Sequence, residues 1–428
     1  MKARTKLQRR IYSMSQRLSP ISEKQKEWAF RHCFHHYGRR IRKGTVSCLE
    51  CGHEWLDRSI GPGPCVCPHC GWTIEIVETR KRRFQREKTY FCILTTCGGY
   101  QVIRIFDTFA SRCVGHKALY GCNEVVQLWI TPDGKVVSIA RMRPMLSMLS
   151  MYLDRWDYAS DLEVRPNRMS YDINPEFIYP WKQVIPAIKR NGFRGDLHGC
   201  SPLSLFLALL NDCRAETLFK AGQFPMFAHE IRSQVCSDER YWPSVRICMR
   251  RGYLIQDASM WCDYIDLLRY FNKDILSARY VCPENLQSEH DRLERKKREL
   301  LRKEDLQRKM QQAQAAEEQF RELKSRFFGI SFADGTIRVR VLQSVAEHLL
   351  EGELMHHCVF TNNYYARPES LILTAQIGEQ HIETIEVSLE TFQIVQSRGV
   401  CNRPTAYHDR IISLVEQNME QIRRCASA

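Results

Sequence analysis

The chain has 428 residues, of which 44% are hydrophobic and 26% are charged, an ordinary balance for a soluble globular protein of two or three domains. The formal net charge of +14 favours a polyanionic partner, most often nucleic acid, over a protein that is merely basic. No stretch approaches the roughly eighteen apolar residues of a membrane span, and the basic N-terminus lacks the apolar core of a signal peptide. The nineteen cysteines are therefore expected to be reduced thiols of a cytoplasmic protein, with a few of them acting as metal ligands.

Residues 1–47 are predicted to form a basic arm, because thirteen Lys and Arg stand against two Glu there. Four cations near the end of the arm are predicted to contact nucleic-acid phosphates: Arg39, Arg40, Arg42 and Lys43. Aromatic residues interleave with the cations, and they would either stack on bases or pack against the next domain: Trp28, Phe30, Phe34 and Tyr37. Packing is the favoured interpretation for these rings.

Residues 48–78 carry the strongest local pattern, two C-x2-C pairs separated by fifteen residues and each followed by glycine. Two residues between cysteines let a tight turn aim both thiolates at one ion, and glycine permits the turn. Two such turns close a tetrahedral shell with no open position, which predicts a structural zinc ion in a zinc ribbon. The predicted ligands are Cys48, Cys51, Cys67 and Cys70. Cys65 could replace Cys67, and His53 or His69 could substitute for a thiolate.

Residues 79–170 are predicted to form an antiparallel β domain. Its four strand-like runs are 90–95, 100–108, 124–131 and 135–141, and Pro132-Asp133-Gly134 is a turn between the last two. A second basic run precedes the first strand. Its predicted nucleic-acid-binding residues are Arg80, Lys81, Arg82 and Arg83.

Residues 171–285 are predicted to form a helical domain, in which Ser201-Pro202 begins one helix and Asp257 caps another. Residues 286–327 lack Gly and Pro and alternate in charge at i, i+3 and i+4, which predicts one long, exposed helix. The helical domain and the long helix could dock a protein partner. The long helix could also dimerise as a coiled coil, although its heptad pattern is not sustained.

Residues 328–428 are predicted to form a small α/β domain. Ser344 and Glu347 give a capping box for a helix that Gly352 would end. Three strand-like runs joined by short connections follow, which predicts an antiparallel meander. The runs are 371–377, 381–389 and 392–396, and an amphipathic helix is expected over 406–424.

Two polar clusters flank this meander, and the fold could bring them together as a catalytic site. His356 and His357 could act as bases or metal ligands, and Glu386 as a general acid or base. Arg398 could hold phosphate oxygens, and Gln396 could orient a water molecule. The alternative is structural: Arg398 would pair with Glu386, and His357 would cap the end of the preceding helix.

The C-terminal block resembles the PcfJ-like family, named after a protein encoded on a conjugative plasmid. The resemblance rests on three pieces, which are His357-Cys358-Val359 followed by Tyr364 or Tyr365, then Thr384 and Glu386, and finally Gln396, Arg398, Gly399 and Asn402. It implies a bacterial mobile genetic element as the context, and it implies no established catalytic residues.

Together these features predict an α+β multidomain, cytoplasmic protein that binds nucleic acid in the transfer or maintenance of such an element. A phosphodiesterase or nuclease using the C-terminal polar residues is the first alternative. A protein–protein adaptor in a transfer complex is the second.

Overall fold

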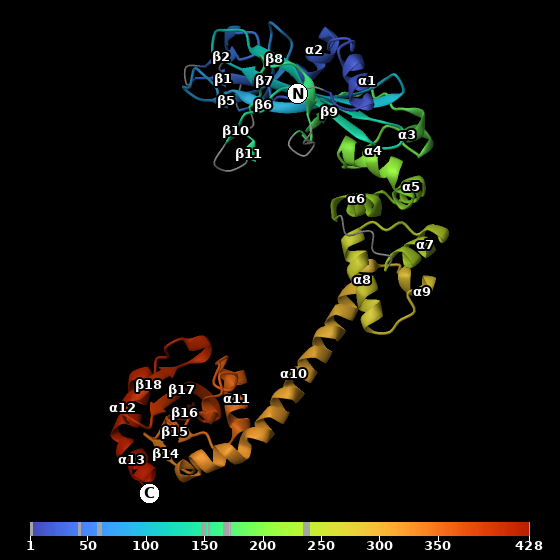
Figure 1. Cartoon of the computed structure of the whole chain (residues 1–428). Coiled ribbons are helices and arrows are strands. Elements are labelled where there is room, and N and C mark those ends of the chain that lie inside the picture. The colour runs from blue at the N-terminus through green and yellow to red at the C-terminus, as the bar shows by residue number, and fades with distance from the viewer. Residues whose placement is uncertain are drawn as a thin grey trace. The chain divides into compact units, whose positions relative to one another are not determined.

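The computed structural model describes residues 3–41, 44–57, 62–146, 151–152, 155–165, 171, 173–233 and 240–427 (Figure 1). The chain divides into two compact units, Met1–His290 and Asp291–Ala428. Helices and sheets occur in both units, so the predicted α+β class is confirmed. Within the described ranges, no helix combines the length and apolar character that crossing a membrane requires.

The ribbon in the first unit is a five-stranded sheet that continues into the predicted basic arm. Its order is β3 (Glu54–Leu56), β2 (Thr45–Cys48), β1 (Tyr37–Arg40), β5 (Thr73–Glu78) and β4 (Gly63–Val66). Strand β1 pairs antiparallel with β2 and parallel with β5, so it is the central strand of the sheet. The end of the arm is therefore part of the ribbon.

A six-stranded sheet follows in the order β12 (Glu163–Arg165), β9 (Val136–Ala140), β8 (Leu119–Ile130), β7 (Tyr100–Ser111), β6 (Glu87–Cys97) and β13 (Phe177–Ile178). The ladders are antiparallel except for β13, which pairs parallel with β6. Strand β13 lies in the range expected to be helical, and two residues are too few to show an alternating pattern. Strands β10 (Met145–Leu146) and β11 (Met151–Tyr152) pair antiparallel in a separate two-stranded sheet.

Helices α1 (Lys6–Ser15) and α2 (Glu23–His32) cover one face of the six-stranded sheet (Figure 1). Ile11 of α1 packs on Tyr100 and Val102, whereas α2 and the residues after it pack on Phe106 and Ala110. These four residues alternate along β7 and so share one face. Trp28, Phe30 and Phe34 belong to the second of these clusters, which confirms the packing interpretation of these rings.

The remaining helices of the first unit are α3 (Pro186–Arg190), α4 (Pro202–Asn211), α5 (Cys213–Lys220), α6 (Phe224–Ser233), α7 (Trp242–Arg250), α8 (Ala258–Tyr270) and α9 (Ala278–Val281). The side chains of Ser201 and Asp257 cap α4 and α8 as predicted. Asp212 both ends α4 and caps α5. Helix α10 (Leu286–Lys324) has 39 residues and crosses the boundary between the units, so the predicted long helix is present.

The second unit is a three-layer α/β structure. Its sheet has the order β14 (Ser331–Ala333), β15 (Arg338–Val341), β16 (Ser370–Ile377), β17 (Gln380–Ser388) and β18 (Ile394–Arg398). Every ladder is antiparallel, so the predicted meander is confirmed. Helix α11 (Val345–Met355) lies on one face, and α12 (His408–Gln417) and α13 (Met419–Ser427) lie on the other (Figure 1). Ile385 and Val387 of β17 pack on the α12 and α13 side.

Two predicted helix boundaries in this unit are wrong. Gly352 lies inside α11, which continues to Met355 and ends at His356 in the left-handed conformation (φ 54°, ψ 46°). The backbone N–H of His357 donates to the Gly352 carbonyl at 3.0 Å. Gly352 is therefore part of the last turn of α11 and does not follow the helix. The helix expected over 406–424 is two helices, because the chain breaks at Asn418.

Candidate functional site

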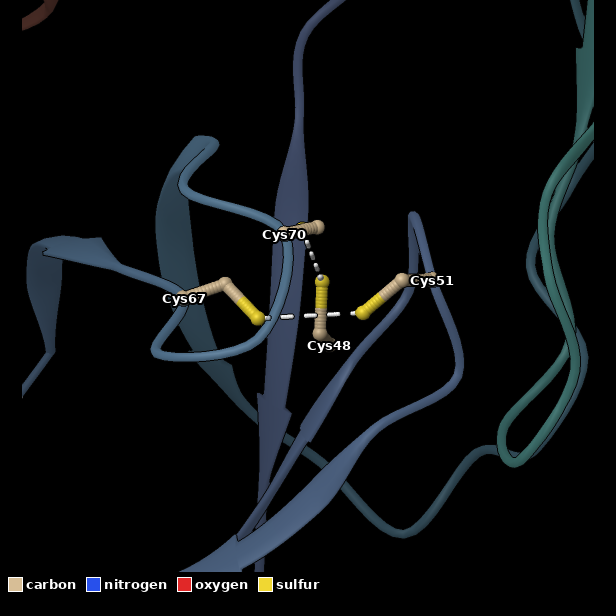
Figure 2. Close-up of side chains that lie close together, drawn as sticks. All are labelled: Cys48, Cys51, Cys67 and Cys70. Atoms are coloured by element: carbon tan, nitrogen blue, oxygen red, sulfur yellow. Dashed lines mark hydrogen bonds between the residues drawn. The ribbon is translucent and has the colours of Figure 1, made fainter.

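The four predicted ligand cysteines converge at one end of the ribbon (Figure 2). Cys48 and Cys67 are buried, Cys51 and Cys70 are half-buried, and all four sulfur atoms lie within 4.8 Å of one another. The distances are 3.8 Å between the Sγ atoms of Cys48 and Cys70, and 3.7 Å between those of Cys51 and Cys67. Four sulfurs placed tetrahedrally about 2.3 Å from one ion would be about 3.8 Å apart. The cluster therefore fits one tetrahedral metal ion.

The two knuckles repeat the same backbone pattern. The N–H of Gly52 donates to the Cys48 carbonyl at 3.0 Å, and that of Gly71 donates to the Cys67 carbonyl at 2.9 Å. Both glycines have positive φ, 81° and 71°, which a residue with a Cβ adopts only with strain. Gly52 also leaves no room for a Cβ, because the backbone carbon of His116 would lie 2.9 Å away. The glycines noted in the sequence thus allow the turns that aim the thiols.

The alternative ligands stay outside the cluster. The Cys65 thiol, on β4, is within 3.5 Å of the Val66 carbonyl instead. His53 and His69 stack on each other with ring centroids 5.1 Å apart. Among the described residues, only the four predicted cysteines form such a ligand group.

The protonation of these thiols couples metal binding to pH. Burial raises the pKa of Cys70 to about 11 and that of Cys48 further. Burial acts on Cys67 as well, but donation from the backbone of Cys70 and His69 brings the pKa of Cys67 below its usual value. A metal ion must therefore displace protons from Cys48 and Cys70, and acid would release it.

A buried ion pair joins the ribbon to the six-stranded sheet. Glu50, between the first two cysteines, accepts a hydrogen bond from the Arg112 guanidinium at 2.8 Å and from the Tyr120 hydroxyl at 2.5 Å. Arg112 also donates to the His35 carbonyl and pairs with Glu87 at 3.1 Å. Burial opposes ionisation of Glu50, but its hydrogen-bond donors and the Arg112 charge keep its pKa below the usual value. Sequence reasoning missed this network, because its members are far apart in the chain.

The predicted nucleic-acid-binding cations fall into two groups, apart from Arg42 and Lys43, which lie outside the described residues. Arg39 donates to the backbone carbonyls of Thr79 and Arg80, and Arg40 pairs with Glu78 at 2.8 Å, so both contribute to the ribbon's structure. The second group lies between β5 and β6 with exposed side chains and, in the described part of the chain, without ion pairs. This cationic run consists of Arg80, Lys81, Arg82 and Arg83.

The second unit has a cleft of about 270 Å³ where the two predicted polar clusters meet. His357 comes from the loop after α11, Glu386 from β17, and Gln396 and Arg398 from β18. His356 is exposed at the end of α11 and does not line this cleft. The fold thus brings together four of the five predicted catalytic residues. The other polar lining residues are Cys358, Asn362, Tyr364, Thr384 and Asn402.

The imidazole of His357 is held at both nitrogens. Nε2 donates to the Gly399 carbonyl at 2.7 Å, and Nδ1 lies 3.1 Å from the Thr384 hydroxyl. The Thr384 hydroxyl in turn donates to Glu351 at 2.7 Å. His357 therefore fastens the loop after α11 to the turn after β18, because its Nε2–H is committed to the Gly399 carbonyl.

Glu386 and Arg398 are a carboxylate and a cation that line the same cleft. The Glu386 carboxylate accepts from Ser370 at 2.8 Å and from the Gln396 amide at 2.7 Å, and it is 9% exposed. The guanidinium of Arg398 is exposed, and within the described chain it makes no ion pair with Glu386 or another carboxylate. The cleft lining thus combines a buried carboxylate with an exposed cation that forms no ion pair within the described chain.

Two further buried carboxylates were missed by sequence reasoning. Glu351 of α11 contacts His381 Nδ1 at 2.5 Å as well as Thr384. Glu383 of β17 contacts Ser397, Thr405 and His408, and both carboxylates are fully buried. Burial opposes ionisation of Glu383, but these donors keep its pKa below the usual value. The only sequence signal concerned Glu383, which lies on the apolar face of a predicted strand, whereas Glu351 of α11 gave none.

We expect the second unit to lose stability between pH 6.5 and pH 4 because of His348. This side chain is 2% exposed on α11, and burial lowers its pKa to about 4. In the unfolded chain His348 binds a proton near pH 6.5, but in the folded chain it stays neutral down to about pH 4. The free energy of unfolding therefore falls by roughly 3 kcal/mol as the pH drops through this window. Hydrogen exchange of α11 amides, corrected for intrinsic rates, would measure it. His348→Met should make stability depend less on pH, whereas the control variant His356→Gln, at an exposed position, should keep the dependence. If stability fell equally steeply with pH in both variants, His348 would not be the titrating group.

One family model matches a part of the chain that includes the cleft and leaves the metal cluster outside the match. Searches of curated proteins and of solved structures found no significant match. A family model described as PcfJ-like protein matches residues 260–412, which run from α8 to α12 and include every predicted catalytic residue. Residues 260–412 thus match the PcfJ-like protein family, which confirms the resemblance inferred from the C-terminal motifs.

Proposed function

We propose that this chain binds nucleic acid through its first unit, with a structural zinc ion in the four-cysteine cluster. The observation that carries the proposal is the cationic run Arg80–Arg83, whose four side chains are exposed and without carboxylate partners in the described chain. Unpaired cations on a fixed backbone bind phosphates by releasing counterions. The backbone is fixed because Arg83 bridges to Cys113, and Val114 donates to the Arg82 carbonyl.

Zinc is the ion that best suits the cluster. Four thiolates are soft ligands, and the sulfur spacing is that of a closed tetrahedral shell. A shell with no open position holds structure and carries out no chemistry. The ion would keep the ribbon folded, and the ribbon in turn holds Thr79 and Arg80 through Arg39.

Neutralising part of the cationic run should weaken nucleic-acid binding and its dependence on salt. For Arg82→Gln/Arg83→Gln we expect the slope of log affinity against log salt to become less steep by about 1.4–1.8, because each of the two lost phosphate contacts removes roughly 0.7–0.9. The measurement is fluorescence anisotropy with single- and double-stranded DNA and RNA over a salt series.

The matched control is Arg302→Gln/Lys303→Gln, which removes the same charge from exposed positions on α10. It should leave the slope unchanged. If both double variants shift the slope equally, binding follows net charge and the cationic run is not the site. If no probe binds at moderate salt, the proposed function fails.

A second candidate function is phosphodiester hydrolysis in the cleft of the second unit. The observation that favours it is the meeting of Glu386, Gln396 and Arg398 there. Glu386 would take a proton from the water whose oxygen bonds to phosphorus, and Arg398 would hold the phosphate oxygens. The P–O bond to the leaving oxygen breaks as the new bond forms, and the leaving oxygen takes a proton from solvent. His357 would position the loop through its hydrogen bond to the Gly399 carbonyl.

If the cleft is catalytic, cleavage of the same probes, with and without magnesium, should fall by about a hundredfold or more in Glu386→Gln and Arg398→Ala. Arg424→Ala, an exposed arginine on α13, is the control and should cleave normally. Equal cleavage by all variants would point to a contaminating nuclease. Intact probes with the wild-type protein would remove the second candidate and leave the first.

A further inference from the structure

A hollow of about 790 Å³ lies between α2, the knuckles of the ribbon and the connection from β7 to β8. We call it the ribbon hollow. Its wall on the α2 side includes Lys24, Trp28 and Arg31, which share one helix face at i, i+4 and i+7. Trp72 on the other side directly follows the second knuckle, and Lys117 comes from the connecting loop. All of these residues belong to the first unit.

The ribbon hollow is lined by aromatic rings that are only half-buried. Trp28, Phe30, Trp72 and Tyr120 all contribute to its lining, and none of them is fully buried. The core side of α2 differs, because Ala29 is completely buried. One face of Trp28 stacks on His32, with ring centroids 4.9 Å apart, and Phe30 stacks on Tyr120 at 4.7 Å. The parts of these half-buried rings that remain uncovered are the surfaces on which a planar, unpaired base could stack.

The charges around these rings suit a phosphate chain. Lys24 and Lys117 have exposed side chains and, among the described residues, no ion-pair partner. The guanidinium of Arg31 lies 5.4 Å from the centroid of the Trp72 ring, so a cation and a ring already sit side by side. The lining also holds two carboxylates. The charge of Glu50 is neutralised by Arg112. Glu27 is exposed, and its carboxylate could accept a hydrogen bond from the amino or imino group of a base, whereas a phosphodiester has no proton to donate.

We propose that the ribbon hollow binds an unpaired base of single-stranded nucleic acid, a proposal that rests on the nucleic-acid binding argued above. The base stacks on the aromatic lining, and the flanking phosphates lie against Lys24, Arg31 and Lys117. The volume falls within the roughly 300–1,000 Å³ of sites for small organic ligands. The paired bases of a duplex cannot enter such a hollow, whereas a flexible single strand can place one base in it. The cationic run supplies charge, and the ribbon hollow supplies preference for single strands.

The test compares two probes of equal length and charge, oligo(dT) of about twelve nucleotides and an abasic strand with the same phosphates. The metal-loaded, full-length protein should bind oligo(dT) at least about tenfold more tightly than the abasic strand, because stacking adds to charge. Trp28→Leu or Trp72→Leu should remove this preference and keep the affinity for the abasic strand. Trp181→Leu, at an exposed tryptophan outside the lining, should change nothing.

Lys117→Ala guards against misfolding of the tryptophan variants, since this loop residue is exposed. It should weaken the binding of both probes about equally, with unchanged metal content. Equal binding of the two probes by the wild-type protein would overturn the ribbon-hollow proposal while leaving nucleic-acid binding in place. A preference for oligo(dT) that survives both tryptophan variants would also overturn it. Failure of every probe to bind, duplex included, would overturn both proposals.

Discussion

Replacing Cys67 by serine should strip the metal from the four-cysteine cluster and unfold the ribbon, whereas replacing Cys65 should do neither. The two cysteines are two residues apart, yet only Cys67 shares the 4.8 Å cluster with Cys48, Cys51 and Cys70. Structural zinc contributes about 10–16 kcal/mol in small zinc-binding peptides. That contribution exceeds the stability of many whole domains, which is about 5–15 kcal/mol. Loss of one ligand should therefore be decisive for the ribbon.

The measurement is metal content by mass spectrometry together with limited proteolysis. The wild-type protein and Cys65→Ser should each carry about one ion per chain and resist cleavage between residues 44 and 78, whereas Cys67→Ser should carry little metal and be cut there. A chelator should reproduce the Cys67→Ser pattern in the wild-type protein. Equal metal content in the two serine variants would show that the cluster is not the binding site.

Arg112→Leu should destabilise the first unit by about 3–5 kcal/mol, because it leaves the Glu50 carboxylate buried without its cation. The Arg112 side chain is 1% exposed and that of Glu50 is 4% exposed, so water cannot replace the lost partner. Tyr120→Phe removes one hydrogen bond to the same carboxylate and should cost about 1–3 kcal/mol. A larger loss of stability in Arg112→Leu than in Tyr120→Phe would show that the charge of Arg112 stabilises Glu50 more than the Tyr120 hydrogen bond does.

Urea unfolding followed by tryptophan fluorescence measures this effect selectively, since all eight tryptophans lie between residues 28 and 261, within the first unit. The control is Lys135→Leu, which breaks a solvent-exposed ion pair with Asp133 and should leave the midpoint unchanged. An Arg112→Leu midpoint no lower than that of the control would show that the buried ion pair does not hold the ribbon to the sheet.

Local patterns of residues predicted the parts of this structure that depend on neighbours in the chain. The spacing of Cys48 and Cys51, repeated at Cys67 and Cys70, is sufficient to indicate the metal cluster, because each knuckle is a turn of four residues. The alternation along β17 indicates its two faces for the same reason. The caps at Ser201 and Asp257 are likewise local.

Long-range pairing could not be predicted in this way. The parallel pairing of β1 with β5 joins residues about 38 positions apart, and nothing in Tyr37–Arg40 distinguishes a central strand from a basic arm. Glu50 and Arg112 are 62 positions apart, and each is an ordinary charged residue until the fold buries both. The roles predicted for His356 and His357 could not be separated from sequence, because the left-handed turn at His356 points one outward and the other inward.

The two glutamates of β17 restrict how the length of this strand can vary. Glu383 meets its partners on the α12 side, and Glu386 meets Ser370 and Gln396 on the cleft side. Residues three apart in a strand lie on opposite faces, so deleting one residue between the two glutamates would put both on the same face. One carboxylate would then be buried without its hydroxyl donors, at a cost of several kcal/mol. Insertions and deletions among relatives should therefore be confined to the turns at Gly378 and Phe392, where the backbone is already left-handed.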